Sequence, residues 1–533
     1  MPLSPQSKLA TGTQGMISSA HPMATKVGLM ILQRGGNAFD AAVAIAAALN
    51  VVEPMNSGIG GYGTILLYQA RQRKCRFLNS SSRIPMNVES DRFRPPAPNF
   101  EANRRGAMAI STPGNVRGWQ VLSEVYGNLP WADLLQPAID LAQNGFAVTW
   151  ALARDINRYF SSFPSHAQMI YSRNGRPLRT GELLVQDDLA HSLALIAREG
   201  PAVFYGGPLG QRIVSVVQAS GGVLSLADLT HCKADWFEPL AITYRDHQIF
   251  TASPPATSFA ALIRLGLMSQ FNVKALDHNS AEYLHLFAEV TKHAYRCRLA
   301  YAADPDISKV PLEELLSTQY WQEVGSQLNM TQAVPFNVLL PTAESSPHTT
   351  HFVVADKEGN IVSATQTIGQ MFGSRLMPPG TGIWMNNSLQ YCTFEPKGNP
   401  MDAHPGRHKL SGDCPVIIFR DGYPIMALGT PGGHTIPQTV PQIIMNLLDF
   451  GMDMAEAIAQ PRISFKEPDQ ILADPPLADA TRTALAVKGH LIQEFADGLG
   501  NAHGLTLEYE QSAHPIRFSG AADPRGEGLA VGL

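Results

Sequence analysis

The sequence predicts a mixed α+β fold in which helices cover a β-sheet, and three observations lead to this prediction. Segments with helix-like and strand-like patterns alternate from His21 onward. Apolar residues at helical spacing dominate from about Leu129 to Val334. The C-terminal third contains two predicted hairpins, with helix-like sequence after the second. Hairpins flanked by helices are typical of a mixed sheet with helices packed on one or both faces.

The N-terminal part is predicted to begin with two helices and two strands. The segment 22–34 has apolar residues at helical spacing and stops at two consecutive glycines. Asn37 or Asp40 is suited to cap the next helix, which we expect to end near Glu53. The segment 58–79 is a glycine-rich turn followed by two strands around a polar turn.

The C-terminal third is predicted to contain hairpins and helices. "THFVVADKEGNIVSATQT", 350–367, has the pattern of strand, turn and strand, and 416–433 repeats it around an Asp-Gly turn. Helices are expected at about 435–450 and at 453–461. The segment 335–347 is rich in proline and serine, so it is the best candidate in the chain for an exposed connector at a boundary.

Composition argues against several classes of partner. The chain has 533 residues, of which 44% are hydrophobic and 16% charged, as in ordinary folded proteins. The 40 lysines and arginines are balanced by 45 acidic residues, and no long basic run occurs, so we expect no nucleic-acid partner. The most apolar run, 41–52, is about half of the ~20 residues that cross a bilayer. We therefore expect a buried helix there, and no membrane partner.

The cysteines and the N-terminus indicate the compartment. The five cysteines are odd in number, widely spread, and not at metal-ligand spacing with histidines. We therefore expect free thiols in a reducing compartment and no metal held by these cysteines. Residues 1–16 contain no apolar core of a secretory signal, so we expect a cytoplasmic protein.

Local sequence alone offers few candidate catalytic residues. The glycines of 58–63 precede a strand, whereas a dinucleotide-binding fingerprint follows one, so a structural turn is favoured. "TPGGH", 430–434, lies between a strand and a helix, and its glycines either expose N–H groups to an oxyanion or form a plain turn. His434 is predicted to be a packed or surface histidine. Thr349 and Thr350 have the character of β-branched residues that open a strand.

Eight blocks of sequence carry more information when they are taken in order. They are "SSAHPMATKVGLMILQRGGNAFDAAVAIAAALNVVEP", "AISTPGNVRGWQVLSEVYGNLPWADLLQPAIDLAQNGF", "AVFYGG", "GGVLSLADL", "FAEVTKHAYRCRLAYAADPD", "TTHFVVADKEGNIVSATQT", "TPGGHTIPQTVPQIIMNLLDFG" and "GAADPRGEG". Together, from Met16 to the C-terminus, the chain resembles the γ-glutamyltranspeptidase family, whose members are N-terminal-nucleophile hydrolases made as one chain.

The resemblance implies a fold and a maturation step. The fold is the N-terminal-nucleophile hydrolase αββα sandwich, which consists of two stacked β-sheets covered by helices. The family's chains cut themselves before the first threonine of a T-T-H motif, which here lies between His348 and Thr349. A large segment, 1–348, and a small segment, 349–533, would then form a heterodimer that is together one structural domain. The sequence leaves open whether this heterodimer assembles further.

The resemblance also implies that Thr349 is the catalytic nucleophile. After the cut, its α-amine is the general base for its own hydroxyl, because an α-amino group titrates at roughly 7.7–8.0. The acyl group taken from an amide is then released by water or by an acceptor amine, and we expect this chemistry to use no metal and no organic cofactor. Thr367, on the opposite strand, aligns with the threonine that orients the nucleophile. Gly432 and Gly433 align with the pair whose N–H groups form the oxyanion hole.

Positions that bind the substrate carboxylate match the family in part. Ser411 aligns with the first of two serines that hold this carboxylate, and Gly412 replaces the second. Arg83 stands about two residues later than the family's carboxylate-binding arginine. Its guanidinium either forms the bidentate contact or belongs to an ordinary surface arginine.

Positions that would hold a glutamyl α-ammonium depart further from the family. Gln390 and Tyr391 stand where the family has acidic residues, and Gly369 stands where it has an asparagine. A buried ammonium needs an anionic or carbonyl-rich seat. These differences favour an amide whose acyl part bears a carboxylate but no α-amine.

Three functions are weighed on these grounds. The first is a γ-glutamyltransferase or hydrolase acting on glutathione-like compounds, and the second is an oxamate amidohydrolase or glutaryl-type acylase. For both, the partner is a small-molecule amide. The third, a non-catalytic or unprocessed relative that serves as a binding or structural protein, is disfavoured by the intact Thr349, Thr367 and paired glycines. The segment 395–409 is either a lid over the pocket or a surface connector.

Overall fold

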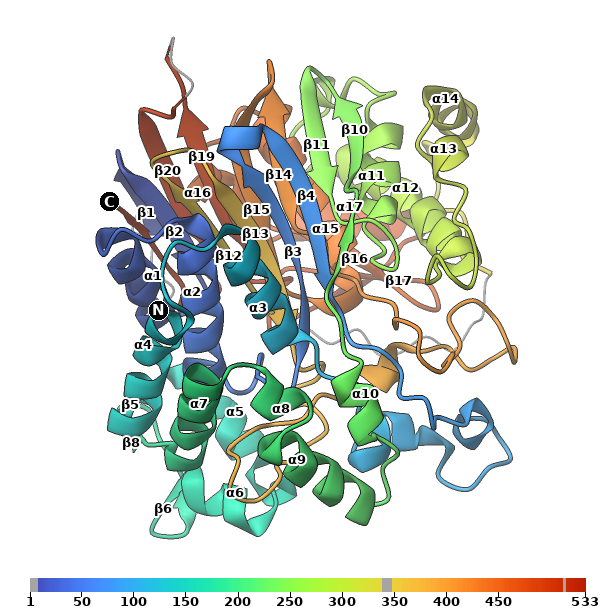
Figure 1. Cartoon of the computed structure of the whole chain (residues 1–533). Coiled ribbons are helices and arrows are strands. Elements are labelled where there is room, and N and C mark those ends of the chain that lie inside the picture. The colour runs from blue at the N-terminus through green and yellow to red at the C-terminus, as the bar shows by residue number, and fades with distance from the viewer. Residues whose placement is uncertain (1–7, 338–347, 511–513) are drawn as a thin grey trace.

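The protein is a four-layer sandwich of helices and sheets. The computed structural model describes residues 8–337, 348–510 and 514–533. Two seven-stranded sheets stack face to face, and helices cover their outer faces (Figure 1). This arrangement confirms the predicted α+β class and the αββα sandwich.

The first sheet is antiparallel throughout and runs in the order β21, β2, β12, β13, β3, β4, β9. Its strands are β21 (Leu529–Gly532), β2 (Gly15–Ser19), β12 (Thr350–Asp356), β13 (Ile361–Thr367), β3 (Tyr62–Gln69), β4 (Lys74–Ser80) and β9 (Asp235–Phe237). Strands from the small segment therefore lie beside strands from the large segment, which ties the two into one sheet.

The second sheet is also antiparallel, in the order β1, β20, β19, β15, β14, β11, β10. Its strands are β1 (Leu9–Gly12), β20 (Arg517–Ala522), β19 (His503–Glu508), β15 (Tyr423–Gly429), β14 (Val416–Arg420), β11 (His247–Thr251) and β10 (Leu240–Tyr244). Strands of the large segment form both of its edges. Shorter strands are β5 (Phe146–Ala147), β6 (Ser172–Arg173), β7 (Arg176–Pro177), β8 (Leu183–Leu184), β16 (Ile463–Lys466), β17 (Gln470–Ala473) and β18 (Leu491–Glu494).

Helices are divided between the two outer faces. Four helices lie on the side of the first sheet: α1 (Pro22–Gln33), α2 (Ala38–Val52), α3 (Asn115–Tyr126) and α4 (Trp131–Asn144) (Figure 1). Four others lie on the side of the second sheet: α11 (Phe259–Met268), α12 (Ala281–Tyr301), α15 (Ile436–Leu448) and α16 (Met454–Ala459). The remaining helices are α5 (Trp150–Tyr159), α6 (Ser165–Ile170), α7 (Asp187–Glu199), α8 (Ala202–Tyr205), α9 (Pro208–Ala219), α10 (Leu226–Thr230), α13 (Leu312–Leu315), α14 (Thr318–Gln327) and α17 (Asp479–Val487).

Three buried apolar layers separate these four layers of secondary structure. The layer between the sheets includes Met16, Leu66, Val353, Ile417 and Leu505. The other two layers lie between each sheet and its helices. Both faces of each sheet are therefore buried, which explains why strands such as β12 are apolar on successive residues instead of alternating.

Helix α2 shows how sequence determines one of these elements. Asn37 caps it, and the Asp40 carboxylate accepts a hydrogen bond from the Asn37 N–H in return, so both predicted capping residues take part in one capping box. All of its residues are buried, because it packs between α1, α4 and the first sheet. A helix that is apolar on every side is expected in such a position, and the predicted end near Glu53 is confirmed.

The structure differs from the sequence-based expectation between Leu129 and Val334. Strands β9, β10 and β11 lie within this region, where we predicted mainly helix. β10 and β11 form a hairpin at the edge of the second sheet, with buried and less buried residues alternating. Each strand is short, so its period-two pattern is easily masked by the helical stripes around it.

The structure describes the two predicted connector segments, 335–347 and 395–409, to different extents. Most of 335–347 lies outside the described residues, but Phe336 is buried against Tyr295 and Phe465. In 395–409, Asp402 pairs with Arg94 and is buried, so this segment packs against the protein at several points. Among the described residues, no helix is both long and apolar enough to cross a membrane.

Candidate active site

Thr349 lies where β12 begins and β13 ends. In the register of this hairpin, Thr350 pairs with Gln366, so Thr349 and Thr367 are neighbours across the ladder. Their hydroxyl oxygens are 3.3 Å apart, and both residues are buried. The structure therefore brings together the two threonines that the sequence singled out.

The carbonyl oxygen of His348 connects the two hydroxyls. It lies 2.8 Å from Thr349 Oγ1 and accepts a hydrogen bond of 2.9 Å from Thr367 Oγ1. The Thr367 oxygen in turn accepts the N–H of Gly369 at 2.9 Å. This chain of hydrogen bonds places a hydroxyl beside the carbonyl of the peptide bond that precedes it, while a second hydroxyl polarises the same carbonyl.

A buried carboxyl group lies one residue further along. The Thr350 hydroxyl donates a hydrogen bond of 2.7 Å to Glu53, at the C-terminal end of α2. Burial raises the pKa of the Glu53 carboxyl to about 7, although hydrogen bonds from Thr350 and Asn56 oppose the rise. Sequence reasoning treated Glu53 only as a helix end, because nothing local indicates its distant partner.

The "TPGG" turn lies between β15 and α15, as the sequence predicts for 430–434. Gly432 and Gly433 have φ values of 142° and 59°, a region that side chains rarely adopt. The strand before this turn ends at Gly429, where a Cβ would lie 2.3 Å from the ring of His351. The turn therefore follows a strand whose last residue, Gly429, packs directly against His351 in β12.

Two predicted substrate-binding residues, Gly412 and Tyr391, contact this turn, and Ser411 directly precedes Gly412. A Cβ on Gly412 would lie 2.2 Å from the carbonyl oxygen of Gly433, so this glycine packs against the turn. Ser411 Oγ accepts the N–H of Asp413 at 3.1 Å. The ring of Tyr391 packs edge-on against His434, at 5.7 Å between ring centres. His434 is buried, which agrees with the prediction of a packed histidine.

Arg83 points toward a different partner. It follows β4, and its guanidinium forms an ion pair with Asp235 on the edge strand β9. It also donates to the carbonyl of Gly406 at 3.3 Å. The guanidinium is thus already held by a carboxylate of the protein, and a substrate carboxylate would have to compete with Asp235.

Comparison with known proteins decides the family. The family model described as "Gamma-glutamyltranspeptidase" matches residues 24–533. The chain belongs to this family. It is 32% identical to the "Glutathione hydrolase proenzyme" of Bacillus subtilis (strain 168), over 98% of this chain and 92% of that protein. It is 34% identical to the "Acylase ACY 1 proenzyme" of Pseudomonas sp. (strain V22), over 99% and 95%.

Solved structures agree with this assignment. The crystal structure of cephalosporin acylase from Bacillus halodurans superposes with a TM-score of 0.89, at 28% identity, over 98% of this chain and 97% of that one. The relatives are glutathione hydrolases and acylases, so this γ-glutamyltranspeptidase-family chain is an enzyme that hydrolyses a γ-glutamyl or other acyl amide, with the N-terminal-nucleophile fold.

In this γ-glutamyltranspeptidase-family enzyme, amide groups fill the region beside Thr367. A Cβ on Gly369 would lie 2.1 Å from Asn387 Oδ1, so the Asn387 side chain occupies the space of a side chain at 369. The same oxygen accepts the N–H of Gln370 at 2.8 Å and is 3.3 Å from the Gln390 amide. The substitutions at 369 and 390 are therefore structurally coupled through Asn387.

One charged residue near Tyr391 was missed by sequence reasoning. The ammonium of Lys409 lies 3.8 Å from the ring centre of Tyr62 and 4.8 Å from that of Tyr391. Lys409 is buried, and burial lowers its pKa to about 7 despite the attraction of Asp413. Its neighbour Tyr62 pairs with Thr367 across β3 and β13, which links this cation to the region of Thr367 and Thr349.

Proposed function

We propose that this enzyme cuts itself before Thr349 and then uses Thr349 to hydrolyse an amide whose acyl part carries a carboxylate but no α-amine. The main support for the cut is that the hydroxyls of Thr349 and Thr367 both lie within hydrogen-bond distance of the His348 carbonyl oxygen. The absence of acidic residues at 390 and 391 supports a substrate whose acyl part has no α-amine.

The hydrogen bonds at His348 support the proposed cut. The Thr349 hydroxyl oxygen attacks the His348 carbonyl carbon, and the bond from this carbon to the Thr349 nitrogen breaks. The hydroxyl proton passes to that nitrogen, which becomes an amine, and His348 is left as an ester on Thr349 Oγ1. Water hydrolyses the ester, so that His348 gains a carboxylate and Thr349 regains its hydroxyl. Thr367 supports the step by its hydrogen bond to the carbonyl oxygen.

After the cut, the new amine supplies the base for catalysis. An α-amino group with a pKa of roughly 7.7–8.0 is partly neutral near pH 7, so it accepts the proton of the Thr349 hydroxyl as the hydroxyl attacks the substrate. The N–H groups of Gly432 and Gly433 are suited to hold the oxyanion because both glycines form a tight turn. The two segments stay together as a heterodimer because β12 pairs with β2, and β13 with β3.

The charges near Tyr391 support the proposed substrate class. A glutamyl substrate would bring an ammonium group beside Gln390 and Tyr391, where the family's acidic seat is missing. Lys409, near Tyr391, adds positive charge to this region below its pKa of about 7, with Asp413 as its nearby counter-charge. A cation there repels an ammonium and attracts a carboxylate. This combination favours a glutaryl-type or oxamate-type amide over glutathione.

Purified protein on a denaturing gel tests the cut. We expect two bands, with the smaller one beginning at Thr349 by N-terminal sequencing, and a single band for Thr349→Ala. Thr180→Ala changes an exposed threonine and serves as the control that cuts normally. A Thr349→Ala chain that is cut at the same position would overturn the proposed nucleophile.

Two chromogenic anilides test the substrate class. γ-Glutamyl p-nitroanilide and glutaryl p-nitroanilide differ only in the α-amine, so the ratio of their kcat/KM values measures recognition of that group alone. We expect the glutaryl compound to be favoured by about tenfold or more, and ammonia release from oxamate to depend on Thr349. Preference for the glutamyl anilide would leave the nucleophile in place and contradict the substrate class.

A further inference from the structure

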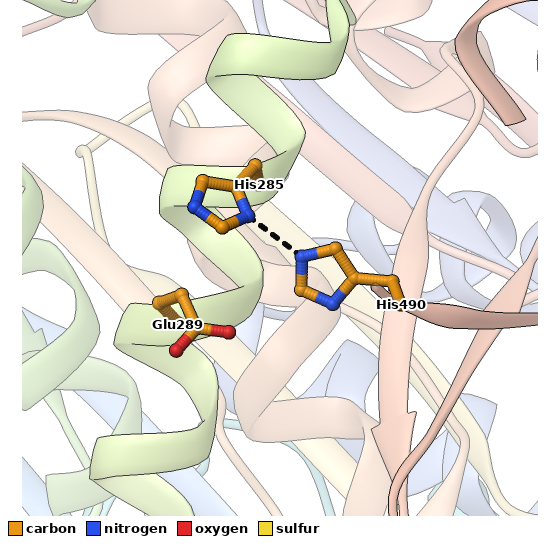
Figure 2. A group of neighbouring side chains, drawn as sticks. All are labelled: His285, Glu289 and His490. Carbon is orange, nitrogen blue, oxygen red and sulfur yellow. Dashed lines mark hydrogen bonds between the residues drawn. The ribbon is translucent and has the colours of Figure 1, made fainter. Parts of the chain in front are cut away.

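Three potential metal ligands meet in the layer of helices outside the second sheet. His285 and Glu289 lie one turn apart on α12, and His490 lies just before β18 (Figure 2). One ligand atom from each residue lies within 4.8 Å of the other two, and all three residues are buried. Figure 2 shows the two rings and the carboxylate directed toward one another.

The hydrogen bonds of His285 prepare one ring nitrogen for a metal. Its Nε2 is 2.8 Å from the carbonyl oxygen of Asn329, and a carbonyl only accepts, so Nε2 carries the proton. The other nitrogen, Nδ1, then presents its lone pair to His490 Nε2 at 2.8 Å. A ring that donates one N–H to a backbone carbonyl and offers the opposite nitrogen is the usual form of a histidine ligand.

The remaining polar atoms of the cluster are incompletely satisfied. Among the described residues, Glu289 Oε1 and His490 Nδ1 are buried without a hydrogen-bond partner. The Lys292 ammonium lies 3.2 Å from Glu289 Oε1, but Asp469 also lies 3.2 Å from this ammonium. The two carboxylates therefore share the Lys292 ammonium, and Lys488 carries a second positive charge near the two rings.

We propose that His285, Glu289 and His490 bind one zinc ion. Two imidazoles and a carboxylate are a donor set that zinc takes in proteins, with Zn–N distances of about 2.0–2.1 Å. Tetrahedral geometry would set the two ring nitrogens about 3.3 Å apart, so the present 2.8 Å has to widen by only about 0.5 Å. Water would complete the coordination.

The position of the ligands assigns the ion a structural role. His285 and Glu289 belong to the large segment, and His490 belongs to the small one. Asn329 and Val334, near the end of the large segment, also contact His285 and Glu289. If the chain is cut before Thr349 as proposed above, the ion joins the two separate segments and holds the tail of the first.

Zinc titration of tag-free protein tests the site. After chelator treatment and dialysis, calorimetry should show one zinc per chain, and cobalt should give the visible absorption of a four-coordinate ion. His490→Gln should weaken zinc binding by about 100-fold or more, whereas His191→Gln, an exposed histidine, should leave it unchanged. Less than one tenth of a zinc per chain, or equal affinity in His490→Gln, would overturn the proposal.

Two further measurements cover folding and the bridging role. If circular dichroism shows that metal-free His490→Gln is misfolded, Glu289→Gln takes its place in the titration. Glu289→Gln should also lose the rise in Tm that zinc produces in the wild type. Thr349→Ala, which is not expected to be cut, should bind zinc as the wild type does, so the site is tested independently of the cut. In cut protein, a chelator should lower the urea concentration at which the segments separate, and an unchanged midpoint would refute the bridge alone.

Discussion

The Thr350 hydroxyl donates to the Glu53 carboxyl at 2.7 Å, which fixes a buried acid one residue beyond the His348–Thr349 peptide bond. Glu53 comes from the end of α2, so the first helices of the large segment reach the start of the small segment. Burial raises the pKa of this carboxyl to about 7. The group therefore changes its charge in the pH range where the enzyme's proposed base also titrates.

Replacing Glu53 should change the pH dependence of stability. The unfolded carboxyl titrates near 4.5 and the folded one near 7, so the folded state binds more protons and loses stability as pH rises from 4.5 to 7. This loss is on the order of 3 kcal/mol and is complete above pH 7. Glu53→Gln does not titrate, so its urea midpoint should fall less between pH 5 and pH 8.

The comparison is made in Thr349→Ala protein, so that every sample is one intact chain. Glu323→Gln removes an exposed acid and should keep the wild-type pH dependence. If the urea midpoints of Glu53→Gln and of its Thr349→Ala parent change in parallel with pH, the pKa of the Glu53 carboxyl is not raised in the folded chain.

Thr367 should control the rate of self-cleavage. Its hydroxyl donates to the His348 carbonyl, which the proposed cut attacks, and loss of such a donor costs about 10²–10³-fold in rate. Thr367→Ala should therefore accumulate the two bands more slowly by about this factor, while Thr367→Ser, which keeps the hydroxyl, should stay within about tenfold of the wild type. Equal rates for alanine and serine would rule out the hydrogen bond as the cause.

Much of the fold could be predicted from local patterns. The capping residues Asn37 and Asp40, the hairpin 350–367 and the turn after β15 are determined by neighbours in sequence, and the structure has them where expected. β10 and β11 could not be predicted in this way. Their place at an edge of the second sheet depends on β14, which lies far along the chain.

The candidate site could be predicted only where a motif marked it. Thr349 and Thr367 were found through the family motif, and their distance follows from the hairpin register. Glu53 lies 297 residues from Thr350 in sequence, and Lys409 meets Tyr62 and Tyr391 only after folding. Local sequence contains no signal for such pairs, because burial and not spacing determines their chemistry.

Restoring the family's serine at position 412 should harm the enzyme. A Cβ there would lie 2.2 Å from the Gly433 carbonyl oxygen, so the Gly433 peptide has to move. Gly412→Ser should therefore lower kcat on the preferred anilide by about 10²-fold, the usual effect of losing one oxyanion donor. In Gly325→Ala, on α14, the new Cβ would make only ordinary van der Waals contacts of 3.6 Å or more, so kcat should be unchanged. Full activity in Gly412→Ser would mean that this turn does not hold the oxyanion.

Lys409 should determine affinity for the carboxylate of the acyl group. It is a buried cation beside Tyr391, and a hydrogen bond to a charged group contributes about 1.5–3 kcal/mol. Lys409→Met should therefore raise KM for glutaryl p-nitroanilide by about 10–150-fold with a smaller effect on kcat, and the control Lys309→Met, an exposed lysine, should change neither.

The same lysine should give carboxylate binding a pH dependence. The pKa of Lys409 is lowered to about 7, so the free enzyme loses this positive charge as pH rises through 7, and KM should increase above that pH. In Lys409→Met, KM should be high at every pH and show no such rise. Steady-state kinetics from pH 6 to pH 9 measure KM for the wild type and for Lys409→Met. A wild-type KM that is constant across this range would show that Lys409 does not contact the carboxylate. A rise in KM that persists in Lys409→Met would show the same.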